Sequence, residues 1–126
     1  MKNSAQLVEA AKSNIKEVTI EQLKEQMDSG IVVIDVREPG EYSQGHIPKV
    51  ANLPRGILEM NLANHPAVKE EGNPLQSLND KGVYLICRSG ARSALAAESM
   101  VTMGFDNVYS VAGGMMAWQE AGFEME

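Results

Sequence analysis

Two short apolar runs limit what this chain can fold into. Residues 31–36 read IVVIDV and residues 82–87 read GVYLIC, so both runs are apolar at nearly every position rather than at alternate positions. Such a run is typical of a strand that is buried on both faces of a parallel sheet. Parallel strands need long connections, usually helices, between them. The sequence therefore predicts an α/β domain with a mainly parallel central sheet.

The remaining segments supply the helices and the shorter strands. Residues 91–103 are rich in helix-forming residues and end at Gly104, a residue suited to the left-handed position after a helix. Thr19 is placed to cap a helix that has Gln22 at its third position and Gly30 beyond its end. The shorter predicted elements are a helix over 5–11, strands over 18–20, 50–53 and 107–111, and a helix over 115–120.

Composition and charge exclude several classes of protein. The 126 residues fit one domain, and we assign 1–17 to an accessory helical segment and 18–126 to that domain. The net charge of −6 argues against nucleic-acid binding, which needs a cationic surface. One cysteine and two histidines form neither a zinc cluster nor an internal disulfide. No run resembles a secretory signal or a membrane span, so we expect a cytoplasmic protein without a metal or a membrane partner.

The only cysteine, Cys87, opens the run CRSGARS directly after the second apolar run. Ligands of parallel sheets collect beyond the carboxyl ends of strands, and the helix expected next directs its N-terminal dipole and free N–H groups there. Gly90 permits a tight turn in which backbone amides converge on an anion. Cationic neighbours such as Arg88 and Arg92 favour a thiolate. A lone intracellular cysteine is more often a small buried apolar residue, but two cations and a glycine turn favour a reactive nucleophile.

Three motifs lie in order along the chain. They are DVRE at 35–38 with EY at 41–42 and GHI at 45–47, CRSGARS at 87–93, and VAGG at 111–114 with AW at 117–118. Together they resemble the signatures of the rhodanese family of sulfurtransferases, over residues 18–123. The resemblance implies a rhodanese-like three-layer domain whose mainly parallel central sheet is flanked by helices.

The resemblance also implies a double-displacement reaction. Cys87 attacks the outer sulfur of a donor such as thiosulfate or another persulfide and becomes a persulfide itself, and an acceptor then removes that sulfur. The acceptor is cyanide in assays and a thiol or a sulfur-acceptor protein in cells, and no metal or organic cofactor is implied. Besides the catalytic Cys87, the implied site residues are Arg88, Ser89, Gly90, Ala91 and Arg92 in the active loop, with Asp35 and Arg37 in support.

The charged residues near the loop have more than one interpretation. Arg88 either contacts an anionic donor or is a solvated cation. Arg92 is predicted to brace the loop by pairing with a carboxylate such as Asp35 or Glu38. Asp35 is assigned to architecture, because an ionised thiol needs no general base. The segment 58–80 departs from the family pattern and is expected to shape the rim of the pocket.

Other side chains are predicted to be structural. Arg37 and Glu41 are expected to form an ion pair at the surface or at the rim of the site. His46 is expected to be a packed or hydrogen-bonded loop residue, and His65 to be exposed. Trp118 is expected to anchor the last helix in the core.

Two other functions remain open. Cysteine-dependent phosphatases and arsenate reductases also use a cysteine loop closed by arginine, but their loop has five intervening residues, whereas four separate Cys87 from Arg92. A non-catalytic binding or regulatory module is the second alternative, because related domains can keep the fold and lose catalysis.

Overall fold

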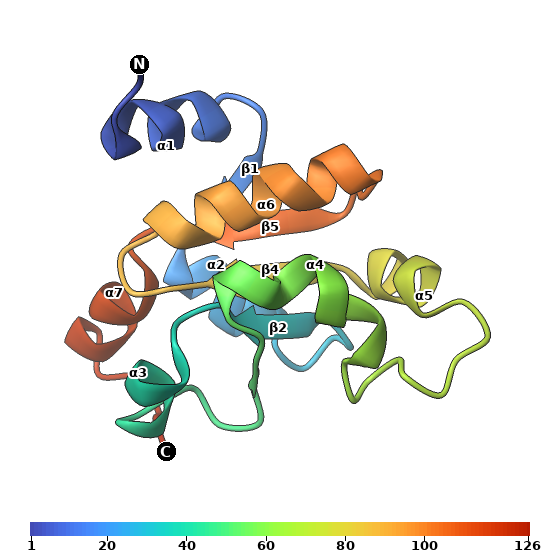
Figure 1. Cartoon of the computed structure of the whole chain (residues 1–126). Helices are drawn as coiled ribbons and strands as arrows, with labels where there is room; N and C mark the ends of the chain where they lie inside the picture. The colour runs from blue at the N-terminus through green and yellow to red at the C-terminus, as the bar shows by residue number, and fades with distance from the viewer.

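The computed structural model describes residues 1–126 and contains one five-stranded sheet with helices packed against it (Figure 1). Every strand pair in the sheet is parallel. The strands are β1 (Lys16–Val18), β2 (Val32–Asp35), β3 (Ala51–Asn52), β4 (Val83–Ile86) and β5 (Val108–Val111). The helices are α1 (Ser4–Lys12), α2 (Ile20–Gln26), α3 (Pro39–Ser43), α4 (Leu58–Asn61), α5 (Pro74–Lys81), α6 (Ala91–Met103) and α7 (Gly114–Glu120), with short 3-10 turns η1 (Arg55–Ile57) and η2 (Leu62–Asn64) on either side of α4.

The strand order β1-β5-β4-β2-β3 places β4 at the centre of the sheet and β2 beside it. All four residues of β4 are buried, as are three of the four in β2. These strands occupy the two apolar runs, so the predicted α/β fold with a parallel sheet is confirmed. The short strands predicted over 50–53 and 107–111 are also present, as β3 and β5.

Two apolar cores cover the two faces of the sheet. The larger core receives Leu58 from α4, Leu78 from α5 and Met100 from α6. The smaller core receives Leu23 from α2 and Trp118 from α7. Because each core lies between the sheet and a set of helices, the chain has three layers, as the resemblance implied. Helix α1 lies against α6 (Figure 1), and none of the helices combines the length and apolar character needed to cross a bilayer.

Local signals fix the ends of several elements. The helix α6 ends at Gly104, which has the left-handed φ of 109° that the sequence led us to expect. Thr19 and Gln22 form a reciprocal capping box at the start of α2. The strand predicted over 18–20 is wrong in its position: β1 is Lys16–Val18, because Thr19 is already the N-cap and Ile20 is the first helical residue.

The carboxyl ends of β2 and β4 meet at one edge of the sheet. In the register of these strands Asp35 lies opposite Ile86. Cys87, the residue after Ile86, therefore lies at the same edge of the sheet as the segment that follows Asp35. The sheet topology brings the first and second sequence motifs together there.

Candidate active site

Cys87 lies just beyond the end of β4 and is 1% exposed. Its Sγ atom accepts hydrogen bonds from the backbone N–H of Gly90 at 3.1 Å and of Ser93 at 3.3 Å. The hydroxyl of Ser93 lies 3.4 Å from the same sulfur. Two N–H donors directed at one sulfur favour negative charge on it.

The loop from Cys87 to Arg92 bends back at Gly90, which has a φ of 105° and is the N-cap of α6. The N–H groups of residues 88, 89, 91 and 92 donate to no acceptor in the protein. Free N–H groups at the start of a helix attract an anion. The loop that begins at Cys87 therefore offers unused donors that can bind an anion.

The start of α7 holds the other side of the loop. The N–H groups of Met115 and Met116 donate to the carbonyl oxygens of Cys87 at 2.8 Å and of Arg88 at 3.0 Å. Gly114 makes this close approach possible, because a Cβ atom there would lie 2.6 Å from the carbonyl oxygen of Arg88 and closer still to that of Cys87. The glycine of the third sequence motif thus positions the loop of the second.

The variant Gly114→Ala is expected to lower the free energy of unfolding by about 3 kcal/mol, because the new methyl group meets backbone oxygens and the φ of 53° disfavours a side chain. Chemical denaturation measures this change. Gly122→Ala is the matched control, since Gly122 has a φ of 75° but open space at its Cβ position. Equal losses of stability in the two variants would show that the contact with the loop is unimportant.

Arg92 braces the loop, but its partner differs from the prediction. Its Nη1 and Nη2 atoms donate to the two carboxylate oxygens of Glu41 at 2.6 Å and 2.9 Å. The predicted partners were Asp35 or Glu38, neither of which bonds Arg92. Glu41 lies on α3, and its side chain reaches the start of α6. Glu38 is the N-cap of α3, and Asp35 is bonded to Arg37 instead.

The ion pair between Glu41 and Arg92 predicts a pH dependence of stability. The hydrogen bonds from Arg92 lower the pKa of Glu41 from 4.5 to about 2 in the folded protein. Stabilisation by this group is therefore complete above the unfolded-state value and is lost as the pH falls from about 4.5 to about 2. Because each side chain is about a third exposed, we expect the loss to be below about 1 kcal/mol.

Urea denaturation at pH 5 and at pH 2.5 measures this loss. The variant Glu41→Gln keeps the shape of the side chain and removes the titrating group, so its stability is expected to fall less over the same interval. An identical fall in the variant and the parent would contradict the assignment to this pair.

Asp35 and Arg37 form a buried ion pair at the edge of the sheet. Arg37 donates from Nη2 to Oδ2 of Asp35 at 2.8 Å and from Nε to Oδ1 at 3.0 Å. Arg37 also donates to the carbonyl oxygen of Gly45 at 2.8 Å. The predicted ion pair between Arg37 and Glu41 is wrong, because Arg37 points back over the end of β2 and contacts only the backbone carbonyl of Glu41.

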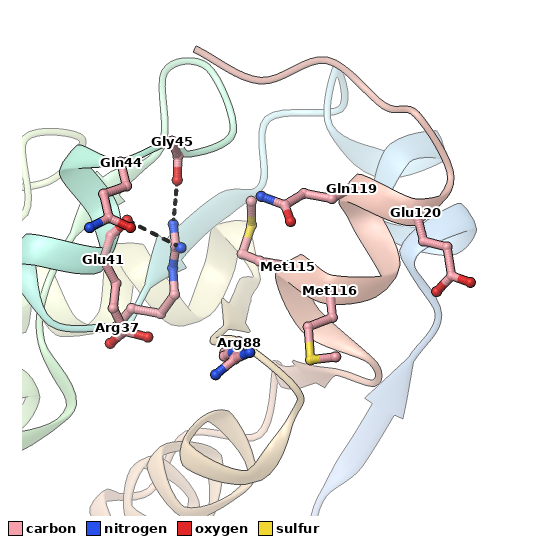
Figure 2. A pocket seen from close by; sticks show the side chains of 9 residues that line it. All are labelled: Arg37, Glu41, Gln44, Gly45, Arg88, Met115, Met116, Gln119 and Glu120. Carbon is pink, nitrogen blue, oxygen red and sulfur yellow. Dashed lines mark hydrogen bonds between the residues drawn. The ribbon is translucent and has the colours of Figure 1, made fainter.

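A pocket of about 790 Å³ lies beside the loop (Figure 2). Figure 2 shows Arg37 and its neighbours on one side of it, residues of α7 on the other, and Arg88 between them. Arg88 is exposed and makes no ion pair or side-chain hydrogen bond, so its charge is free to meet an anion. The lining residues are Arg37, Glu41, Gln44, Gly45, Arg88, Met115, Met116, Gln119 and Glu120. The segment 58–80, expected to shape the rim, contributes none of them.

The two histidines differ from each other. His46 stacks on the ring of Tyr42 at 3.8 Å and its Nδ1 bonds the carbonyl oxygen of the same residue, which confirms a packed loop residue. The prediction that His65 is exposed is wrong: it is 7% exposed, and its Nδ1 accepts the N–H of Ala67 at 3.0 Å. Burial lowers the pKa of His65. Trp118 is 3% exposed, as expected of a core anchor.

Sequence reasoning missed three residues near the sulfur and its loop. Glu41 was paired with the wrong arginine, and neither Ser93 nor Ser110 was assigned a role. The side chains of these two serines are fully buried and their hydroxyl oxygens lie 2.7 Å apart. The available signal was the position of Ser110 between apolar residues in a short strand that packs beside β4. The structure contains no group of three or more His, Cys, Asp or Glu side chains placed to hold a metal ion.

The sequence matches the rhodanese-like domain family over residues 19–121. It is 34% identical over 107 residues to thiosulfate sulfurtransferase GlpE from Pseudoalteromonas translucida, in an alignment that covers 84% of this chain and 90% of that protein. It is 38% identical over 108 residues to YrkF from Bacillus subtilis. That alignment covers 84% of this chain and 52% of the relative, so the chain spans about half the length of YrkF.

A solved structure from Rhodopseudomonas palustris, described as a protein of unknown function and possible tyrosine phosphatase, superposes with a TM-score of 0.83 at 30% identity. The superposition covers 100% of this chain and 96% of that one. The family match extends over most of the sequence and includes all three motifs that surround Cys87. With the identity to GlpE over nearly its whole length, these matches show that the chain belongs to the rhodanese-like domain family.

Proposed function

We propose that this protein is a sulfurtransferase that carries a sulfane sulfur on Cys87. In the first half of the reaction the Cys87 thiolate attacks the outer sulfur of thiosulfate. The new S–S bond forms as the bond to the sulfonate sulfur breaks, and sulfite leaves with that electron pair. Cys87 is then a persulfide with a negative outer sulfur. Another persulfide would react in the same way and leave as a thiolate.

The arrangement around the sulfur atom carries this proposal. Two N–H groups bond Sγ, and four more in the loop have no acceptor in the protein. Donors fixed in place before the reaction stabilise charge without having to reorganise. The exposed Arg88 adds a free positive charge at the pocket, which favours an anionic donor on a protein whose net charge is −6.

In the second half, a nucleophilic acceptor attacks the outer sulfur and Cys87 leaves as a thiolate. We propose cyanide as an assay acceptor and a thiol or a sulfur-acceptor protein as the cellular one. Because Cys87 is the only cysteine, no resolving thiol in the chain can take the sulfur, and it must pass to another molecule. An unpaired cysteine of this kind suits a reducing cytoplasm, which is the location that we propose.

A phosphatase is the second candidate, because the similar structure from Rhodopseudomonas palustris is described as a possible tyrosine phosphatase. A phosphate needs the planar fork of an arginine at the end of the loop. Here both terminal nitrogens of Arg92 already bond Glu41, and four residues separate Arg92 from Cys87. This geometry favours sulfur over phosphate.

Two assays on the purified protein separate these functions. Thiocyanate formation from thiosulfate and cyanide is expected to be fast, and hydrolysis of p-nitrophenyl phosphate is expected to stay at the uncatalysed rate. The opposite pattern would support the phosphatase. Absence of both activities, with no sulfur bound by the protein, would support a non-catalytic binding module.

A further inference from the structure

A chain of two hydroxyl groups leads away from Cys87 into the core. Ser93 lies in the first turn of α6 and Ser110 in β5, and both are fully buried. The Oγ atom of Ser93 lies 3.4 Å from Sγ of Cys87 and 2.7 Å from Oγ of Ser110. The side chain of Ser110 makes no other hydrogen bond, so the chain ends there.

The number of protons shared by Cys87 and the two serine hydroxyls distinguishes the two charge states of Cys87. If Cys87 is a thiol, the sulfur and the two hydroxyls hold three protons for the two contacts between them. One proton, which is that of Ser110 when the S–H donates to Ser93, then has no acceptor among these groups, and a buried donor without an acceptor is unfavourable. If Cys87 is a thiolate, Ser110 donates to Ser93 and Ser93 donates to the sulfur, so each hydroxyl proton has an acceptor.

We propose that Ser93 and Ser110 act together as positioning residues that hold Cys87 in its thiolate form. Ser93 donates to the sulfur directly, and Ser110 acts through Ser93 by fixing the direction of its O–H group. No proton moves between the two serines and the sulfur during sulfur transfer. The hydroxyl groups only reorient, and the proton of a Cys87 thiol leaves to solvent.

The role of this pair in sulfur transfer depends on the proposed function. In the first half-reaction the two serine hydroxyls stabilise the attacking thiolate. In the second half, the bond between Sγ and the outer sulfur breaks and its electron pair returns to Sγ, where the Ser93 hydroxyl meets the new charge. The persulfide carries its charge on the outer sulfur, toward the free loop amides, so the serines serve the inner sulfur and the loop serves the outer one.

Alkylation of Cys87 by iodoacetamide tests the inference without a sulfur donor or acceptor, because the reagent requires only the thiolate. At pH 7 we expect the rate to fall about tenfold in Ser93→Ala and about threefold in Ser110→Ala, since a hydrogen bond to a charged group is lost or weakened. At about pH 10 both variants should react at the parent's rate or faster, because alkaline solution favours the thiolate in every form and a more basic thiolate is more nucleophilic. A change in packing alone would alter the rate at both pH values.

Ser99→Ala is the matched control, because Ser99 lies on the same helix and its hydroxyl donates to Glu59 instead of the loop. It should alkylate at the parent's rate at both pH values. Equal rates for the parent and Ser93→Ala or Ser110→Ala at pH 7 would overturn the inference, and either variant decides it if the other fails to fold. A parent protein that binds no sulfur from thiosulfate would refute the proposed function, whereas the alkylation ratios would still decide the role of the serines.

Discussion

Replacing Cys87 with serine is expected to lower the rate of thiocyanate formation from thiosulfate and cyanide by roughly a thousandfold or more. A serine hydroxyl is not ionised near neutral pH and does not form a stable bond to a sulfane sulfur that an acceptor can remove. The loop amides and Arg88 would still be present, so binding of the donor should survive the loss of transfer. Initial rates at several thiosulfate concentrations measure both effects.

The change should leave the fold intact. Cysteine and serine differ only in their terminal atom, and the two N–H groups that bond Sγ would meet an oxygen instead of a sulfur. We expect the free energy of unfolding to stay within about 1 kcal/mol of the parent's. A folded Cys87→Ser variant that still transfers sulfur would show that the reaction does not pass through this residue.

The variant Asp35→Ala is expected to lower the free energy of unfolding by about 4 kcal/mol, because it leaves the buried guanidinium of Arg37 without its partner. The side chains of this pair are 1% and 7% exposed, so solvent cannot replace the lost carboxylate. Arg37 also donates to the carbonyl oxygen of Gly45, which lines the pocket. The rim of the pocket should therefore loosen as well. Urea denaturation at neutral pH measures the stability.

Glu17→Ala provides the comparison, since Glu17 pairs with Lys12 at 3.8 Å where both side chains are substantially exposed. We expect that variant to lose less than about 1 kcal/mol. The double variant Asp35→Ala with Arg37→Met should recover part of the loss, because it no longer buries an unpaired charge. A loss in Asp35→Ala no larger than in Glu17→Ala would contradict the assignment of this pair to the architecture of the site.

The sequence was sufficient to predict the sheet and the position of Cys87 directly after a central strand. The apolar runs at 31–36 and 82–87 have to be buried on both faces, and only parallel strands covered by helices meet that need. The sharp helix end at Gly104 and the capping box at Thr19 depend on neighbouring residues alone, so they too could be predicted. Such features follow from the local sequence.

The ion pairs could not be predicted, because they depend on where distant elements meet. Asp35, Glu38 and Glu41 all lie in one short stretch, and spacing alone does not say which of them faces Arg92. The answer depends on α3, which begins at Pro39 and directs Glu41 toward α6. Ser110 was missed for the same reason, since Ser93, the residue on α6 that its hydroxyl contacts, lies 17 residues away.

The burial of His65 also depends on tertiary structure. Its immediate sequence neighbours are Asn64 and Pro66, and no continuous apolar run around it predicts a buried ring. The chain between α4 and α5 folds back so that His65 and Val68 lie inside, while the residues between them stay exposed. This segment lies away from the residues that line the pocket, which is why it contributes nothing to the rim.

Mass spectrometry of the intact protein after incubation with thiosulfate tests the persulfide on Cys87 most directly. We expect the mass to rise by that of one sulfur atom, with the addition mapped to the peptide that contains Cys87. Cyanide should then remove the sulfur as thiocyanate and restore the original mass. An unchanged mass after thiosulfate, or an added sulfur on a peptide without Cys87, would contradict the proposed reaction.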